Sequence, residues 1–167
     1  PLTVVTSFDA FMDSLLPKEE IEGRILRIKG DSVLHLEDMQ DRLTQLGYDR
    51  EVQIEGPGQF AVRGGILDVY PLTEEQPVRI ELWGDEVDSI RTFDVETQRS
   101  IENLREIEIC PAVEFPKEGE RSVSFLDYFP AEDSILFLDE PVRLMEKGQG
   151  VEEEFIEAQK KRVESGY

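Results

Sequence analysis

The chain has 167 residues, of which 38 are acidic and 18 basic, so its formal net charge at pH 7 is −20. This charge repels phosphate backbones and argues against nucleic-acid binding over the whole surface; it favours either solubility or the docking of a basic partner. No apolar run could span a bilayer, no signal peptide is present, and the single Cys110 permits no internal disulfide, which together predict a cytoplasmic protein. One cysteine and one histidine are too few nitrogen and sulfur ligands for a zinc site.

The first third of the chain predicts short strands and helices in turn. Residues 1–8 and 23–29 have strand-like patterns, and a short helix is expected over residues 8–16 between them. Apolar residues then recur at helical spacing and are followed by a glycine where helices commonly end, at Leu36, Met39, Leu43, Leu46 and Gly47. This pattern predicts an amphipathic helix over residues 36–46.

The centre of the chain predicts an antiparallel β-meander. Apolar and polar residues alternate in four runs, Phe60–Val62, Ile66–Tyr70, Val78–Trp83 and Val87–Phe93. Turn-forming residues separate the runs, including two consecutive glycines after the first run and Gly84 before the last. The polar face of this meander would carry four charged residues, Arg63, Arg79, Glu81 and Arg91.

The last third predicts a linker at residues 116–121, an uninterrupted apolar strand over 134–138 and a helix over 151–163. Asp139 and Glu140 follow that strand as the acidic pair of a Walker B motif would, which could hold Mg²⁺. However, the chain lacks the Gly-x-x-x-x-Gly-Lys-Ser/Thr loop that cradles phosphates, so ATP hydrolysis is not expected. The acidic pair is better interpreted as a cap on the next turn.

The arginine-bearing face has two interpretations from pattern alone. Arginines beside an aromatic such as Phe60 or Trp83 are typical of a protein-docking patch. The alternative is a solvated face with cross-strand ion pairs, each worth about 0.2–1 kcal/mol. No Ser-His-Asp or Cys-His arrangement has sequence support, and no carboxylate pair can be chosen for acid–base catalysis among so many acids.

The same residues carry a family resemblance. The stretches 58–71, 77–91, 93–94 and 98–100 resemble the UvrB-homology module of bacterial transcription-repair coupling factors (Mfd), and the excision-repair helicase UvrB has a similar block. The resemblance extends back to Val4 and forward to Pro141. UvrB has a phosphate-binding loop in its first domain and a longer Walker B motif, both of which this chain lacks. The coupling factors are therefore favoured, and a fragment of UvrB is the alternative.

The resemblance implies an α+β fold, in which an antiparallel β-meander domain with a packing helix is inserted into a remnant α/β, helicase-like domain. Residues 1–30 and 113–167 would form the remnant domain, and residues 31–112 would form a domain that binds UvrA, the damage-recognition ATPase. The chain would be non-catalytic and would need no cofactor. ATP, Mg²⁺, RNA polymerase and DNA would be bound by other parts of the full-length protein.

The resemblance also implies which residues bind UvrA. The family's contact positions fall on Arg50, Arg63, Arg79 and Glu81, and Phe60 is expected to add apolar contact area. UvrB has a further arginine where this chain has Ala61, so that contact is missing here. Both Arg63→Glu and Arg79→Glu are expected to weaken UvrA binding while leaving the fold intact.

Overall fold

We describe the fold from a computed structural model, which covers residues 2–113, 116 and 119–164. The chain forms two compact units: the described parts of residues 1–13 and 124–167 make the smaller unit, and those of residues 14–123 make the larger one. Within the described residues, no helix combines the length and the apolar character needed to cross a membrane.

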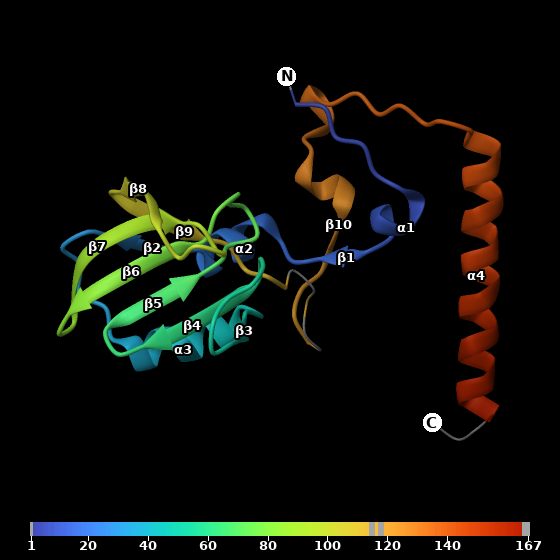
Figure 1. Ribbon diagram of the computed structural model, residues 1–167. Helices are drawn as coiled ribbons and strands as arrows, with labels where there is room; N and C mark the ends of the chain where they lie inside the picture. Colours follow the sequence, from blue (N-terminus) through green and yellow to red (C-terminus); the bar gives the residue numbers. More distant parts are fainter. Residues whose placement is uncertain (1, 114–115, 117–118, 165–167) are drawn as a thin grey trace. The chain divides into compact units, whose positions relative to one another are not determined.

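The larger unit is built on a six-stranded, mainly antiparallel sheet (Figure 1). In order across the sheet, its strands are β3 (Asp49–Arg50), β4 (Gln59–Arg63), β5 (Ile66–Val69), β6 (Val78–Trp83), β7 (Glu86–Phe93) and β8 (Ser100–Leu104). Only β3 runs parallel to its neighbour, and every other adjacent pair is antiparallel. The predicted meander and the α+β fold class are therefore confirmed.

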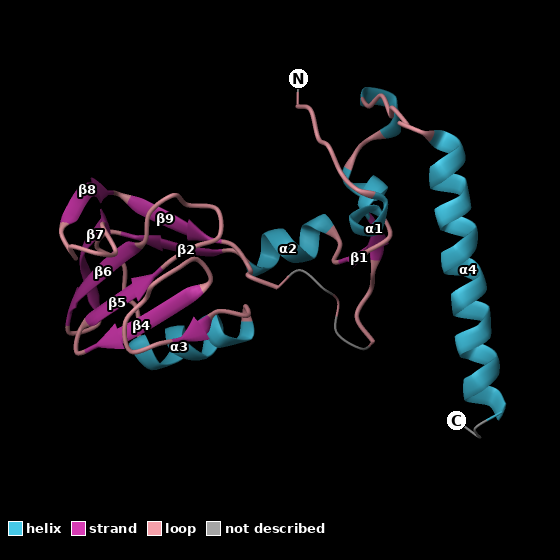
Figure 2. Cartoon of the chain, turned by 45° about the vertical axis from the view of Figure 1, so that its right-hand side comes forward, coloured by secondary structure: helices cyan, strands magenta, loops and turns pink. Residues whose placement is uncertain are grey.

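One face of the sheet is covered by α3 (Leu36–Gln45), which lies along it in both views (Figures 1 and 2). Met39 and Leu43 of this helix are buried against sheet residues in the main core, as the helical spacing predicted. The helix ends at Gln45, and Gly47, just after the capping residue Leu46, has a φ of +87° and a position where a side chain would overlap Val113. Only glycine takes this left-handed conformation without strain and also fits the available space.

A two-stranded ribbon completes the main core. It pairs β2 (Leu26–Lys29) with β9 (Glu106–Ile109), and Leu26 and Ile28 are buried in the same core as α3. The preceding helix α2 (Lys18–Arg24) is joined to residue 120 by an Arg24–Glu120 ion pair of 2.9 Å. Residues 14–30 and the described part of 113–123 lie in the larger unit. The assignment of residues 1–30 and 113–167 to a remnant domain stays a prediction. The predicted linker at 116–121 includes residues 117 and 118, which lie outside the described residues.

The smaller unit contains α1 (Phe8–Phe11), the 3₁₀ turns η1 (Phe125–Tyr128) and η2 (Ala131–Asp133), and α4 (Pro141–Glu164). Lys147 on α4 pairs with Asp9 on α1 at 2.6 Å. The short strand β1 (Ser14–Leu15) belongs to the larger unit, and the limit between the two units falls within β10 (Val123–Ser124).

The strand predicted over residues 134–138 is wrong. These residues form no strand, and the side chains of Ile135, Leu136, Phe137 and Leu138 are exposed. An apolar run becomes a strand only where a neighbouring strand accepts its backbone hydrogen bonds, and no such neighbour occurs among the described residues.

Alkaline pH should destabilise the larger unit through Tyr48. Its buried hydroxyl donates a hydrogen bond to the Cys110 carbonyl at 2.8 Å, and burial raises the pKa of Tyr48 to about 12 from its ordinary value near 10. Because folding favours the neutral phenol, this contribution is full below about pH 10 and is lost as the pH rises through about 12. Urea unfolding at about pH 8 and pH 11 should show a smaller loss of stability for Tyr48→Phe than for the wild type. Equal losses in both proteins would contradict this assignment.

Candidate functional site

The strand register places the predicted charged residues on one face of the sheet, opposite α3. One row of directly opposed residues crosses four strands, from Ala61 through Asp68 and Arg79 to Arg91. The next row consists of Arg63, Ile66, Glu81 and Ser89. Directly opposed residues point to the same side of a sheet, so the predicted sharing of one face by Arg63, Arg79, Glu81 and Arg91 is confirmed.

Asp68 is the centre of this face. It is only 3% exposed, and both of its carboxylate oxygens accept hydrogen bonds from Arg79: Nε donates to Oδ1 at 2.7 Å and Nη2 donates to Oδ2 at 2.8 Å. These hydrogen bonds raise the pKa of Arg79 against the opposing effect of burial. A bidentate arginine–carboxylate pair of this kind is the strongest form of charge-assisted hydrogen bond in proteins.

Arg79 is held from other directions as well. Its Nη2 also donates to Gln98 Oε1 at 2.8 Å, and its guanidinium carbon lies 4.3 Å from the centroid of the Phe93 ring. The side chain keeps only 13% of its surface exposed. Arg79 is therefore a structural residue whose donors are largely used within the fold.

Arg63 is held far more loosely. Its Nη2 lies 3.4 Å from Asp68 Oδ2, and half of its side chain is exposed. Each oxygen of Asp68 already accepts a hydrogen bond from Arg79, so the buried carboxylate stays paired when Arg63 leaves. A single long contact to a half-exposed group contributes at most about 1 kcal/mol. Arg63 is thus the arginine on this face that can change partners.

Glu81 and Arg91 form a second internal pair on the same face. Ser89 Oγ also donates to Glu81 Oε2, at 3.3 Å. Within the described part of the chain, the buried Nε of Arg91 has no hydrogen-bond partner. Because Glu81 pairs with Arg91 and accepts a hydrogen bond from Ser89, its carboxylate is already neutralised within the fold. It is therefore less available to a partner than the resemblance implied.

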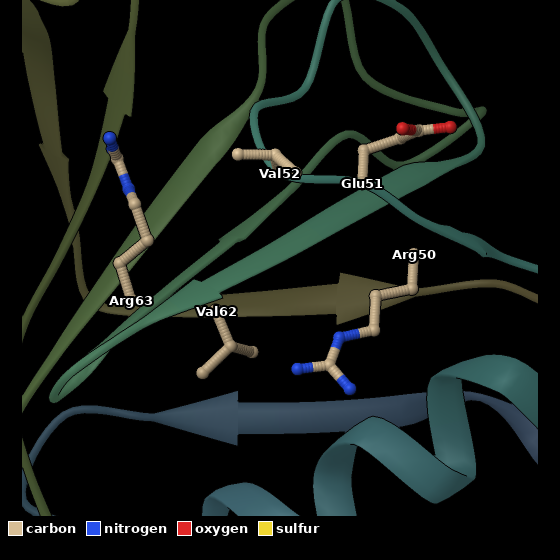
Figure 3. Close-up of a pocket in the computed structure, with 5 residues that line it drawn as sticks. All are labelled: Arg50, Glu51, Val52, Val62 and Arg63. Carbon is tan, nitrogen blue, oxygen red and sulfur yellow. The ribbon is translucent and has the colours of Figure 1, made fainter.

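Arg50 lies at the edge of the sheet, on β3. It is exposed, and it lines a shallow hollow together with Glu51, Val52, Val62 and Arg63 (Figure 3). Figure 3 shows Arg50 and Val62 on one side of β4 and Arg63 on the other. The structure thus brings Arg63 and Arg79 together around Asp68, while the side chain of Arg50, from the edge strand β3, lies on the opposite side of β4.

The expectation that Phe60 adds contact area is wrong. Its side chain is completely buried in the core between the sheet and α3. Alternation along β4 explains this, because Phe60 and Val62 point toward the core, whereas Gln59, Ala61 and Arg63 point to the other side of the sheet. Phe60 supports the site from beneath and cannot touch a partner.

Sequence reasoning missed Asp68 and Gln98. Asp68 interrupts the apolar run Ile-Leu-Asp-Val, and that lone acid on a buried strand was the available signal for an internal partner to an arginine. Gln98 reaches Arg79 from a turn in which its own φ is +59° and Asp94 accepts two hydrogen bonds from Thr97. No local pattern predicts that geometry. Among the described residues, no group of histidine, cysteine and carboxylate side chains could hold a metal ion.

Removing Asp68 and removing Arg63 should have very different effects on stability. Asp68→Ala leaves Arg79 largely buried without its counter-charge, so we expect a loss of about 3 kcal/mol in the free energy of unfolding. Arg63→Ala breaks one long, half-exposed contact and should cost less than about 1 kcal/mol. Urea denaturation of both variants measures these values, and equal losses would contradict the assigned roles.

The same geometry contradicts the expectation that Arg79→Glu leaves the fold intact. That substitution would place a second carboxylate directly against buried Asp68, and two carboxylates in such contact cannot both stay ionised. Arg79 is therefore unsuitable as a test of binding alone.

Comparison with known proteins identifies the larger unit. Residues 26–115 match the model of the UvrB interaction domain family. The matched stretch includes β2 to β9 and the whole charged face. The chain is 42% identical over 127 residues to the transcription-repair-coupling factor of Bacillus subtilis, a match that covers 74% of this chain and 11% of that protein. It is 48% identical over 101 residues to the Staphylococcus haemolyticus protein of the same name, and 38% identical over 107 residues to that of Haemophilus influenzae.

The last two matches cover 60% and 64% of this chain, respectively, and 9% of each relative. The chain thus spans about a tenth of the length of these relatives. Because the family model matches more than half of its residues, the chain belongs to the UvrB interaction domain family.

Proposed function

We propose that this chain is a non-catalytic protein-interaction module of transcription-coupled nucleotide excision repair, and that its larger unit docks UvrA. The family description and the names of the relatives support this proposal. The observation that carries it is the state of Arg63, which is half exposed and has one 3.4 Å contact to a carboxylate that Arg79 already neutralises.

Docking uses the guanidinium groups at the edge of the sheet. Arg63 exchanges its contact with Asp68 for a carboxylate of UvrA, with which it forms a bidentate, charge-assisted pair. Arg50 binds a second carboxylate of UvrA from the other side of β4. Among the described residues, Arg50 forms no ion pair that this contact would have to break. Both cations belong to a chain with a net charge of −20, so an acidic partner surface is attracted to this edge and repelled elsewhere.

The proposal assigns no reaction to this chain. The hollow beside β4 is lined by two arginines, one glutamate and two valines, a set without a nucleophile–base pair or a phosphate-binding loop. ATP hydrolysis and the binding of RNA polymerase and DNA belong to other parts of a full-length coupling factor, where docking brings UvrA to a stalled polymerase. All the relatives named above are coupling factors, which favours this proposal over a UvrB fragment.

Arg63→Glu should weaken UvrA binding by more than about 1 kcal/mol, roughly fivefold in Kd, because it replaces an anchoring cation by a repelling charge. Calorimetric titration of purified UvrA into the folded chain measures the effect. Arg143→Glu is the matched control, because Arg143 is an exposed arginine on α4 and its charge change is the same. UvrB should compete with the wild-type chain for UvrA.

The assigned docking edge would be refuted if Arg63→Glu bound UvrA as tightly as the wild type does, or if Arg143→Glu lost as much UvrA affinity as Arg63→Glu. No binding of UvrA by the wild-type chain would refute the proposed function altogether.

A further inference from the structure

We propose that the loop over residues 51–58 is a strap, which Ile54 fastens to the charged face and which keeps the docking edge in its binding geometry. Ile54 is thereby a positioning residue, which acts through Phe93 and Arg79 and does not touch the partner. This inference rests on the proposed function, because it names what holds the same docking edge in place. Neither the family match nor the sequence pattern assigns a role to this loop.

The topology of the sheet determines where the strap begins and ends. β3 and β4 are adjacent and parallel, so the chain that leaves β3 must return along the sheet before it enters β4. At one end of the strap, the Glu51 N–H donates to the Phe60 carbonyl at 2.8 Å. At the other end, the Gly58 N–H donates to the Tyr70 carbonyl, also at 2.8 Å. Both ends are therefore fixed, and only the middle of the strap can move.

Ile54 fastens the middle of the strap to the charged face. It is only 1% exposed although it lies in a loop, and it packs with Ala61 and Phe93 in a small apolar cluster that is separate from the main core. Ala61 is directly opposite Asp68 and points to the same side of the sheet. Ile54 therefore reaches the sheet from the charged side, opposite α3.

The side chain of Gln59 provides a second fastening. Its Oε1 accepts hydrogen bonds from the N–H groups of Glu55 and Gly56, at 2.8 Å and 3.1 Å. These two donors directly follow Ile54, so the backbone is held where it leaves the apolar cluster. The strap is thus held by an apolar contact and by a polar contact that involves different atoms, and each can be removed separately.

Phe93 couples the strap to Arg79. The Phe93 ring is completely buried in the cluster with Ile54, and the guanidinium carbon of Arg79 lies 4.3 Å from the centroid of that ring. Truncating Ile54 leaves a cavity beside the ring, which allows the ring and the guanidinium to move. Arg79 would then hold Asp68 less firmly, and Asp68 would compete with the partner for Arg63.

The strap also forms one wall of the hollow at the docking edge. Glu51 and Val52 line this hollow together with Arg50 and Arg63 (Figure 3). Val52 is 87% exposed and contributes little to holding the strap, so the position of this wall depends on the fastened residues that follow it. A partner that meets a pre-formed hollow loses less free energy to ordering it.

The test releases the strap at Ile54 and follows its effect on Arg79. In the free chain, Ile54→Ala should speed the solvent exchange of the Gly56 N–H and of the Arg79 Nε–H, both measured by ¹⁵N NMR. In calorimetric titration, the same substitution should weaken UvrA binding about two- to tenfold. Ile54→Val, which keeps a branched apolar side chain, should restore most of the protection and most of the affinity.

Gln59→Ala releases the same strap through its polar fastening and leaves both apolar clusters intact. It should change the two exchange rates and the UvrA affinity in the same direction, and it provides the test if Ile54→Ala does not fold. Circular dichroism checks that each variant is folded at the temperature of the titration.

Ile107→Ala is the matched control. It also truncates a buried isoleucine, but one that lies on β9 in the main core. It should lower the stability of the fold, while the exchange of the Gly56 and Arg79 signals and the UvrA affinity of the folded chain stay as in the wild type.

The outcomes separate this inference from the proposed function. If UvrA binds the wild type and Arg63→Glu weakens binding, but Ile54→Ala and Gln59→Ala keep wild-type affinity, the positioning role is refuted and the docking function stands. The role is also refuted if the exchange of the Arg79 signal is unchanged in both strap variants, or if Ile107→Ala weakens binding as much as Ile54→Ala. If the wild-type chain does not bind UvrA, the proposed function and the positioning role fail together.

Discussion

The bidentate pair between Asp68 and Arg79 organises the charged face on which the proposed function depends. A buried carboxylate is costly unless it is paired and hydrogen-bonded, and Arg79 satisfies both oxygens of Asp68. Gln98 and the Phe93 ring then fix Arg79 in turn. Because the buried charge is neutralised within the sheet, Arg63 is left with one long contact and can bind elsewhere at little cost in stability.

This division of roles could be predicted only in part from the sequence. Alternation along β4–β7 was sufficient to predict the meander and the shared face, and helical spacing predicted α3. The alternation did not show which side of β4 faces α3, so Phe60 was assigned to the surface although it lies in the core. Arg79 was expected to be free because its partners come from other strands and from a turn with an unusual backbone conformation at Gln98. Such pairings depend on tertiary register, which no local pattern encodes.

In the smaller unit, too, a local sequence pattern was not sufficient to predict the structure. An apolar run over residues 134–138 has the composition of a buried strand, but strand formation depends on hydrogen-bonding neighbours that composition does not specify. In the larger unit such a neighbour is present: β2 pairs with β9, and Leu26 and Ile28 of β2 are buried in the main core. The residues that match the UvrB interaction domain lie wholly within the larger unit.

The most direct measurement compares the side-chain Nε–H groups of the two arginines by ¹⁵N NMR, in the free chain and in its complex with UvrA. The account predicts that the Arg79 Nε–H signal is sharp and slowly exchanging, because it donates to buried Asp68, and that it changes little on binding. The Arg63 signal should exchange rapidly in the free chain and become protected in the complex. Equally rapid exchange of both signals in the free chain, or protection of Arg79 alone on binding, would contradict the account.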